Sequence, residues 1–149
     1  MADRPMDPIQ GFAFALEVKG VTEAFFREAS GFGSENDVIE YKQSGPKGIT
    51  FIHKMPGLLK WQNINLKRGI TDNTDLWKWR DKVVKGQIEE ARINGSVVAY
   101  NEDGEEVIRY NFVRGWPSKW TASGVNAQGN EVIIEEIEIV HEGLERAVG

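Results

Sequence analysis

The sequence predicts a mainly β protein with one α-helix, folded as an antiparallel two-sheet sandwich or barrel. Two observations predict this class: apolar and polar residues alternate in several short segments, and Gly, Pro, Asn and Asp separate these segments. A third is that one segment alone, residues 73–85, has the apolar spacing of a helix. With 149 residues and neither a linker nor a repeat, the chain is expected to form a single domain, 1–149, with residues 1–10 as an extended N-terminal segment.

The first predicted strand covers residues 12–18, in which every second residue is large and apolar. Gly20 is expected to turn the chain after it. Residues 21–29 are either a second strand or a buried helical turn, because periodicity does not separate the two in so short an apolar run. Gly31-Phe32-Gly33-Ser34 then interrupts the pattern.

A long hairpin is predicted from residues 38–43 and 49–54, which flank the turn cluster Ser44-Gly45-Pro46-Lys47-Gly48. Met55-Pro56-Gly57 is expected to end its second strand. Alternation returns in residues 61–68, which are predicted as the next strand.

The predicted helix, residues 73–85, carries a stripe of Leu76, Trp79 or Arg80, and Val83. Polar residues 72–74 offer N-caps, and Gly86 occupies the position after the helix where glycine ends helices. This stripe is expected to pack on the sheet.

The second half of the chain predicts a further hairpin and a last strand. Val97 and Ala99 lead through a turn ending in Asp103-Gly104 to a strand at residues 107–113. Gly115-Trp116-Pro117 is expected to interrupt the chain, and residues 123–130 form a polar loop. In the last strand, 131–141, the apolar residues change face, so either a bulge lies near residues 135–136 or both faces are partly covered.

Composition excludes several functions. The chain has no cysteine, which removes thiol catalysis, disulfides and cysteine-based zinc sites. Its formal net charge of −5 argues against a protein whose main task is to neutralise phosphate. No apolar run is long enough to cross a bilayer and the start does not resemble a signal peptide, so we expect synthesis in the cytoplasm and no stable membrane insertion by this chain alone.

The residues offer no catalytic, cofactor-binding or metal site. His53 and His141 are far apart and lack partners at ligand spacing, and no serine lies in a nucleophile elbow. Lys60, Trp61, Lys67 and Arg68 could form a groove for single-stranded nucleic acid, or a strand with a solvated face. The carboxylates of the last strand could act as a general acid and base, or they could face water. If the chain forms a tube, that water could be inside the tube. These residues are Glu131, Glu135, Glu136 and Glu138.

Four stretches in order resemble the tail-tube family of contractile phage tails and phage-tail-like, extracellular contractile injection systems. They are Met55–Thr71 with its Ile-x-Leu-Lys-Arg-Gly segment, Leu76–Arg80, Asn111–Trp120 with its Trp-Pro junction, and Gly129–Glu138 followed by His141-Glu142-Gly143-Leu144. The likeness extends from Phe12 to Leu144. One departure is Gly115, where the family pattern favours a small alanine-like residue.

The resemblance implies a structural subunit of the inner tube, in which hexameric rings stack into a hollow conduit for DNA or protein cargo. It implies the sheath, baseplate and tail-terminator proteins as partners, and a virion or phage-tail-like particle, released from the cell in some systems, as the location. The hairpin would contact the next ring through Tyr41, Lys42, Gln43, Ser44, Gly45, Pro46, Lys47, Gly48 and Ile49. The family-motif positions would have structural roles; they are Pro56, Gly57, Leu66, Lys67, Arg68, Gly69, Trp77, Trp79, Trp116, Pro117, His141, Glu142 and Gly143.

Two alternatives remain open from the sequence. One is a tube initiator or baseplate adaptor of the same family, which would start or cap a tube. The other is a ligand-binding β-barrel module, which would need an internal pocket with converging polar groups.

Overall fold

The computed structural model describes residues 12–124 and 133–147, and it confirms a mainly β chain in which every strand pairing is antiparallel. The helices are α1 (Asp75–Val84) and the short α2 (Ile88–Ala91). The strands are β1 (Ala13–Val18), β2 (Val21–Phe26), β3 (Glu28–Ser30), β4 (Ser34–Ser44), β5 (Thr50–Trp61), β6 (Ile64–Gly69), β7 (Ile93–Tyr100), β8 (Glu106–Ala122), β9 (Ile134–Val140) and β10 (Gly143–Arg146). The expected segment 1–10 and most of the expected loop 123–130 lie outside the described residues.

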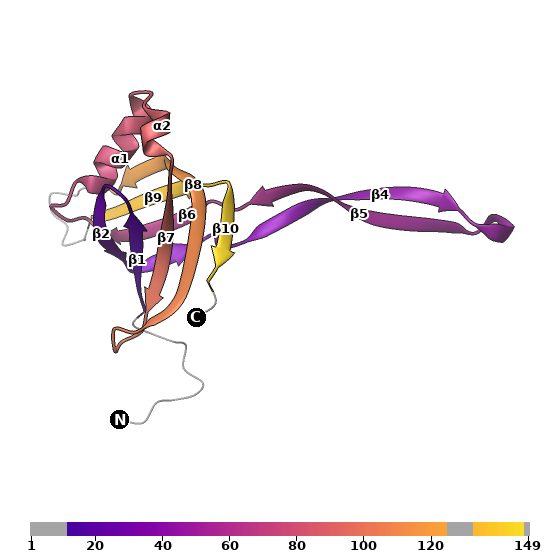
Figure 1. Ribbon diagram of the computed structural model, residues 1–149, viewed down its shortest axis with the longest axis horizontal. Helices are drawn as coiled ribbons and strands as arrows, with labels where there is room; N and C mark the ends of the chain where they lie inside the picture. The colour runs from indigo at the N-terminus through magenta and orange to yellow at the C-terminus, as the bar shows by residue number, and fades with distance from the viewer. Residues whose placement is uncertain (1–11, 125–132, 148–149) are drawn as a thin grey trace.

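The strands other than β4 and β5 form a barrel (Figure 1). Their order is β2-β1-β7-β8-β9-β6-β3, with β10 added on β8. Only Arg27 separates β2 from β3, and its backbone N–H donates to the carbonyl of Lys67 on β6 at 3.0 Å. The path therefore returns to its start, so this chain closes its own barrel.

The barrel interior holds one apolar core, whose largest fully buried side chains include Leu16, Leu66, Phe112 and Ile137. Leu76 and Trp79 of α1 belong to the same cluster, as the helical stripe predicted. The Trp79 indole N–H donates to the carbonyl of Ala91 at 2.7 Å, which fastens α1 to α2. The sequence did not predict α2.

The helix begins later than expected, and Asn73 lies just outside it. The Asn73 side-chain oxygen accepts the backbone N–H of Asp75 at 2.7 Å. At the other end Gly86 has a φ of +82°, so the expected glycine follows the helix. Residues 21–29 prove to be the two strands β2 and β3, and the predicted hairpin around Asp103-Gly104 is confirmed as β7–β8.

Phe112 occupies a slot between two glycines. A Cβ on Gly95 would lie 2.6 Å from the Phe112 ring, and one on Gly115 would lie 2.3 Å from it. Both distances are too short for real atoms, so the core needs glycine at both positions. The departure from the family pattern at Gly115 is therefore explained by the neighbouring phenylalanine.

The prediction that Gly115-Trp116-Pro117 interrupts the chain is wrong, because β8 continues through it. Two shifts in the pairing register of β8 accommodate these residues. Opposite β7, one extra residue of β8 forms a bulge in which Arg114 has a φ of 49° and its N–H donates to the Asn94 side chain. Opposite β9, the register shifts between Pro117 and Lys119. With these bulges β8 pairs first with β7 and then with β9.

The apolar residues of the last strand change face because both faces of the strand are partly covered, which is one of the two expected explanations. The register of β9 with β6 is regular, so no bulge lies near Glu135 and Glu136. The face with Ile137 and Ile139 is buried, and the opposite face is half-buried. The strand begins at Ile134 in the part of the chain that the structure describes and ends at Val140.

The β4–β5 hairpin projects far from the barrel as a two-stranded arm (Figure 1). Both strands are longer than predicted, because Pro56-Gly57 does not end β5. The register shifts here, with Val38 opposite Pro56 and Asn36 opposite Leu59, so β5 carries an extra residue. A strand in a two-stranded hairpin has a free edge, where proline and bulges are tolerated.

Candidate assembly surfaces

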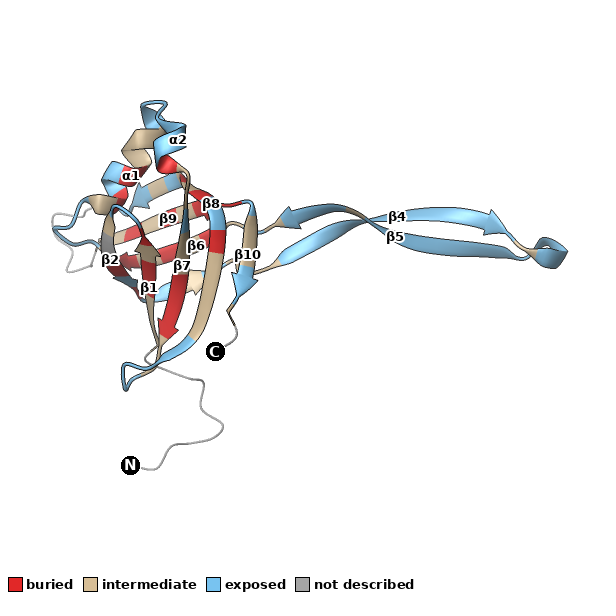
Figure 2. Cartoon of the chain, viewed as in Figure 1, coloured by how far each residue is buried: buried red, intermediate tan, exposed pale blue. Residues whose placement is uncertain are grey.

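The hairpin arm exposes an unusual number of large hydrophobic side chains. Nine of the sixteen that are exposed among the described residues lie between Val38 and Leu59. Figure 2 shows the arm as exposed along almost all of its length. A soluble protein does not usually leave such a surface in water unless it binds something there.

The two faces of the arm differ, because directly opposed residues of a hairpin share a face. One face, here called the apolar face, carries Ile39, Tyr41, Gln43, Phe51, His53 and Met55. The other, here called the charged face, carries Val38, Glu40, Lys42, Ser44, Thr50, Ile52, Lys54 and Pro56. On the apolar face the rings of Tyr41 and His53 stack with centroids 5.1 Å apart.

The tip of the arm is a tight turn over Pro46–Gly48. The backbone N–H of Gly45 donates to the carbonyl of Ile49 at 2.6 Å, which closes the turn. Lys47 and Gly48 have φ values of 61° and 76°, so the chain reverses through left-handed conformations. The expected ring-contact residues, Tyr41 to Ile49, form this distal end, and all of them except Gly45 are exposed.

His141 holds the root of the arm. Its Nε2 lies 3.0 Å from the carbonyl oxygen of Gln62, between β5 and β6. The ring is 6% exposed and contacts Trp61 and Phe112, with centroids 5.9 Å and 6.3 Å away. Burial lowers the pKa of His141 below its usual value, opposed by hydrogen bonds to the backbone of Gln62 and Gly143.

The expected wall-lining carboxylates do not act as one group. Glu135 faces the core, where it pairs with Arg68 at 2.5 Å and accepts the Trp120 indole N–H at 3.0 Å. Glu136 and Glu138 lie on the opposite face of β9, half-buried and directed away from the core. Glu131 lies outside the described residues. Glu135 therefore does not line a wall, because it is buried and its carboxylate pairs with a buried arginine.

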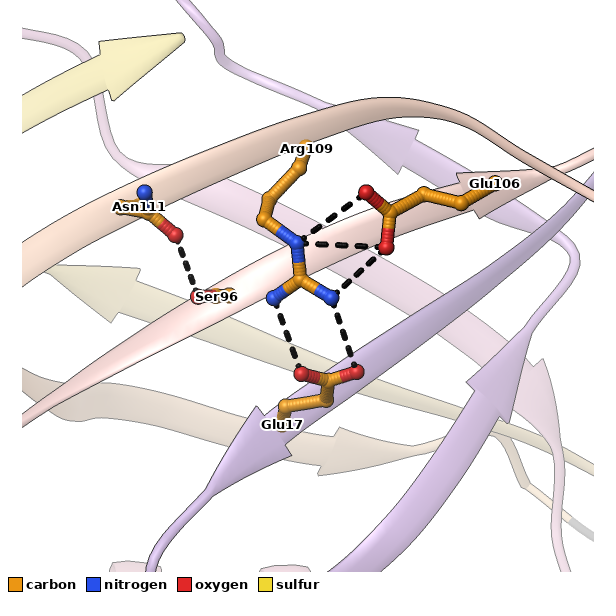
Figure 3. Close-up of polar contacts among 5 residues, drawn as sticks. All are labelled: Glu17, Ser96, Glu106, Arg109 and Asn111. Atoms are coloured by element: carbon orange, nitrogen blue, oxygen red, sulfur yellow. Dashed lines mark hydrogen bonds and ion pairs between the residues drawn. The ribbon is translucent and has the colours of Figure 1, made fainter. Parts of the chain in front are cut away.

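A further polar cluster lies on the outer surface of β1, β7 and β8 (Figure 3). Arg109 donates to Glu106 at 2.7 Å and to Glu17 at 3.0 Å, while Ser96 donates to Asn111 at 2.6 Å. The hydrogen bond from Arg109 lowers the pKa of Glu106. Hydrogen bonds to Glu106 and then to Glu17 raise the pKa of Arg109 further, so this guanidinium stays charged. The cluster fixes the outer surface of the barrel.

The basic residues that could have formed a nucleic-acid groove lie apart from one another. Arg68 is 6% exposed and belongs to the core. Lys60 pairs with Asp37 at 3.1 Å on the arm, and Lys67 lies 3.9 Å from Glu28 on the barrel wall. These residues therefore do not form one basic surface, because the side chain of Arg68 is buried.

The remaining family-motif residues have structural positions. Leu66 and Pro117 are fully buried, and Gly69 ends β6. Trp77 is 49% exposed and meets the Trp120 ring edge to face at 5.0 Å, whereas Trp116 is half-buried. Glu142 accepts from Arg114 at 2.6 Å, directly before Gly143 begins β10. The chemistry of these residues alone does not indicate a functional role. The sequence also did not predict the contact between Arg109 and Glu17, because 92 residues separate them.

Metal-ligand clusters and hollows of the described residues bear on whether the chain could carry a chemical site. Within residues 12–124 and 133–147 no three His, Asp or Glu side chains are placed to hold a metal ion. A hollow of about 330 Å³ lies in the barrel wall between β1, β3 and β6, lined by Phe14, Glu28, Ala29, Ser30, Asn65 and Lys67. Its two charged side chains lie 3.9 Å from one another.

A self-closed antiparallel barrel with a capping helix and a long exposed hairpin defines a tube-type β-barrel fold. The family model described as T4-like virus tail tube protein gp19 matches residues 10–145. The chain belongs to this family of structural tube proteins.

Several solved structures are similar to this chain along most of its length. A chain in the PVC sheath–tube complex, an extracellular contractile injection system in its extended state, is 25% identical with a TM-score of 0.76, and the match covers 97% of this chain and 95% of that one. A chain in the tube-terminating cap of the anti-feeding prophage is 24% identical with a TM-score of 0.76, covering 100% and 97%. Hcp1 from Flavobacterium johnsoniae shares the fold at 15% identity and a TM-score of 0.54, covering 92% and 96%.

No curated protein matches the chain at the sequence level. In the described part of the chain, neither helix has the length and apolar character needed to span a membrane.

Proposed function

We propose that this protein is a subunit of the inner tube of a contractile phage tail or phage-tail-like injection particle, and that it has no enzymatic activity. Copies form hexameric rings, and the rings stack into a hollow conduit for DNA or protein cargo. The sheath surrounds the tube, while baseplate and terminator proteins bind its ends. The particle, sometimes released from the cell, is where the protein acts.

The observation that carries this proposal is the exposed arm. The barrel already has a complete core without it, so the apolar side chains of the arm contribute little to the fold of a single copy. They become buried when another molecule covers them, which supplies the free energy of assembly. The family match supports other copies of the chain as that molecule.

The position of the tip supports the ring-contact role of Tyr41 to Ile49. The arm places these residues at the point farthest from the barrel, so they reach a neighbour before any other part of the chain (Figure 1). Glu136 and Glu138 support a charged wall, because both lie on an outward face of the barrel.

The test is assembly of the pure protein. Sedimentation velocity and negative-stain microscopy over a range of concentrations should show ring-shaped particles and tubes. A monomer at all concentrations, even with its sheath and terminator present, would contradict the proposal. Short particles that never elongate would instead favour the initiator or adaptor role.

A further inference from the structure

We infer that the arm binds a second copy of this chain through its apolar face only, and that its charged face stays in contact with water. The inference rests on the proposed function and adds which surface makes the contact. Three features of the arm support it: the charge of each face, the contacts that hold the apolar side chains in place, and the residue types of the apolar face.

The faces differ in charge. Between residues 39 and 55, the strands place each of their charged residues, Glu40, Lys42 and Lys54, on the charged face. The Lys54 ammonium lies 3.9 Å from the Glu40 carboxylate there. The apolar face carries no Lys, Arg, Asp or Glu over the same stretch. Covering the apolar face therefore desolvates no fixed charge, whereas covering the other face would desolvate three.

The apolar side chains are already held in place within the free arm. Tyr41 stacks on His53, the Phe51 ring lies where a Cβ on Gly45 would be, and Ile39 packs beside Gly57. Side chains fixed before binding lose less conformational entropy when a partner covers them. The two glycines make room for the large side chains across the hairpin, which shapes this face as a contact surface.

The apolar face has the residue types of an interface centre. Its six residues form the middle part of a contact, because a standard protein interface uses about 20–30 residues on each side. Aromatic residues and methionine are the types enriched in such interfaces, and this face has Tyr41, Phe51 and Met55.

A second copy is a suitable partner because the barrel also exposes apolar side chains. Phe25, Val107 and Val113 are 55%, 49% and 44% exposed. An arm that docks on a different surface of an identical copy makes a head-to-tail contact. Contacts of this kind generate rings or filaments, as a tube requires.

Two matched isoleucines test the inference. Ile39 on the apolar face and Ile52 on the charged face are 51% and 58% exposed, and both lie in the same hairpin. Ile39→Asp should raise the concentration needed for assembly by at least about tenfold, as expected for a charge placed in an interface centre. Ile52→Asp should change it by less than about threefold. Pelleting assays and negative-stain microscopy measure assembly, and far-UV circular dichroism with thermal unfolding checks that the barrel stays folded.

A second pair uses neighbouring residues and introduces no charge. Tyr41→Ser should weaken assembly strongly and Lys42→Ser should not, because the two side chains point to opposite faces. If the wild-type protein assembles and both members of each pair weaken assembly equally, or the charged-face variants weaken it more, the inference is overturned while the proposed function stands. If the wild-type protein never assembles, the proposed function is overturned and the inference with it.

Discussion

The carboxylate of Glu135 is a single-residue feature on which the barrel depends. It pairs with the guanidinium of Arg68, whose side chain is 7% exposed and lies 5.4 Å from the Phe26 ring centroid. Glu135→Gln should lower the unfolding free energy by about 3–5 kcal/mol, because a buried arginine loses its counter-charge. Glu136→Gln, one position along on the outward face, should change it by less than about 0.5 kcal/mol. Urea unfolding followed by tryptophan fluorescence measures both; equal losses would refute a structural role specific to Glu135.

The buried ring of His141 makes stability depend on pH. An unfolded imidazole takes up a proton near pH 6.5, whereas in the folded protein burial lowers this pKa. Between these two values the unfolded chain binds more protons, so the unfolding free energy should fall as the pH falls below 6.5. The contribution is complete above that pH and is lost progressively as the solution is acidified toward the folded-state pKa.

Replacement of this ring tests the pH effect. His141→Gln keeps a hydrogen-bond donor for the Gln62 carbonyl but does not titrate. The difference in unfolding free energy between about pH 7.5 and 5.5 should therefore be smaller in this variant than in the wild type. His53→Gln, at an exposed position of the arm, is the matched control and should keep the wild-type difference. Unfolding is measured at a dilution where the protein sediments as a monomer.

Gly115 gives a third prediction for a single residue. Gly115→Ala should destabilise the protein by about 1–3 kcal/mol, because the new methyl group overlaps the Phe112 ring. Gly124→Ala is the control, since no atom lies within 4 Å of the Cβ position there. Thermal unfolding compares the two. A neutral Gly115→Ala would mean that Phe112 moves without cost.

Among elements, the hairpin arm should be dispensable for folding and necessary for assembly. The Gln62 N–H donates to the carbonyl of Gly33 at 3.0 Å, so the chain can be closed near this point. Replacing residues 35–60 by Asn-Gly leaves Ser34 and Trp61 joined through a two-residue hairpin turn. This variant should unfold cooperatively and remain monomeric at concentrations where the wild type forms tubes. A variant that still polymerises would show that the arm is not the contact.

The elements also show how far the sequence can predict the fold. Alternation located the strands around Leu16, Leu66 and Val97, because one face of each packs on the core. Pro56-Gly57 and Gly115-Trp116-Pro117 were expected to break strands, but pairing with a neighbour carries each strand through them as a bulge. The length of the arm was underestimated for the same reason.

The candidate site was only partly predictable. The turn around Pro46 marked the tip of the arm, because Gly and Pro identify tight turns locally. The burial of Glu135 and the clamp at His141 depend on partners 67 and 79 residues away, so no local pattern reports them. The two faces of the arm depend on the pairing register, which a bulge shifts by one residue.

At the scale of the whole molecule, the barrel and the arm have separate tasks. The strand order of the barrel returns to its start, and among the described residues β10 is an edge strand that pairs only with β8. In the described residues β4 and β5 pair only with one another, and their outer edges and large apolar side chains are left exposed. Exposed edges of this kind invite pairing with other chains. The barrel therefore has its own buried core, whereas the arm leaves apolar side chains and strand edges uncovered.

Electron cryo-microscopy of particles formed by the pure protein tests this account most directly. It should show a hollow tube of stacked six-membered rings, with Tyr41, Phe51 and Met55 of each copy packed against a neighbouring copy. Solitary barrels at high concentration, or a tube whose arms project into water with these side chains uncovered, would contradict it.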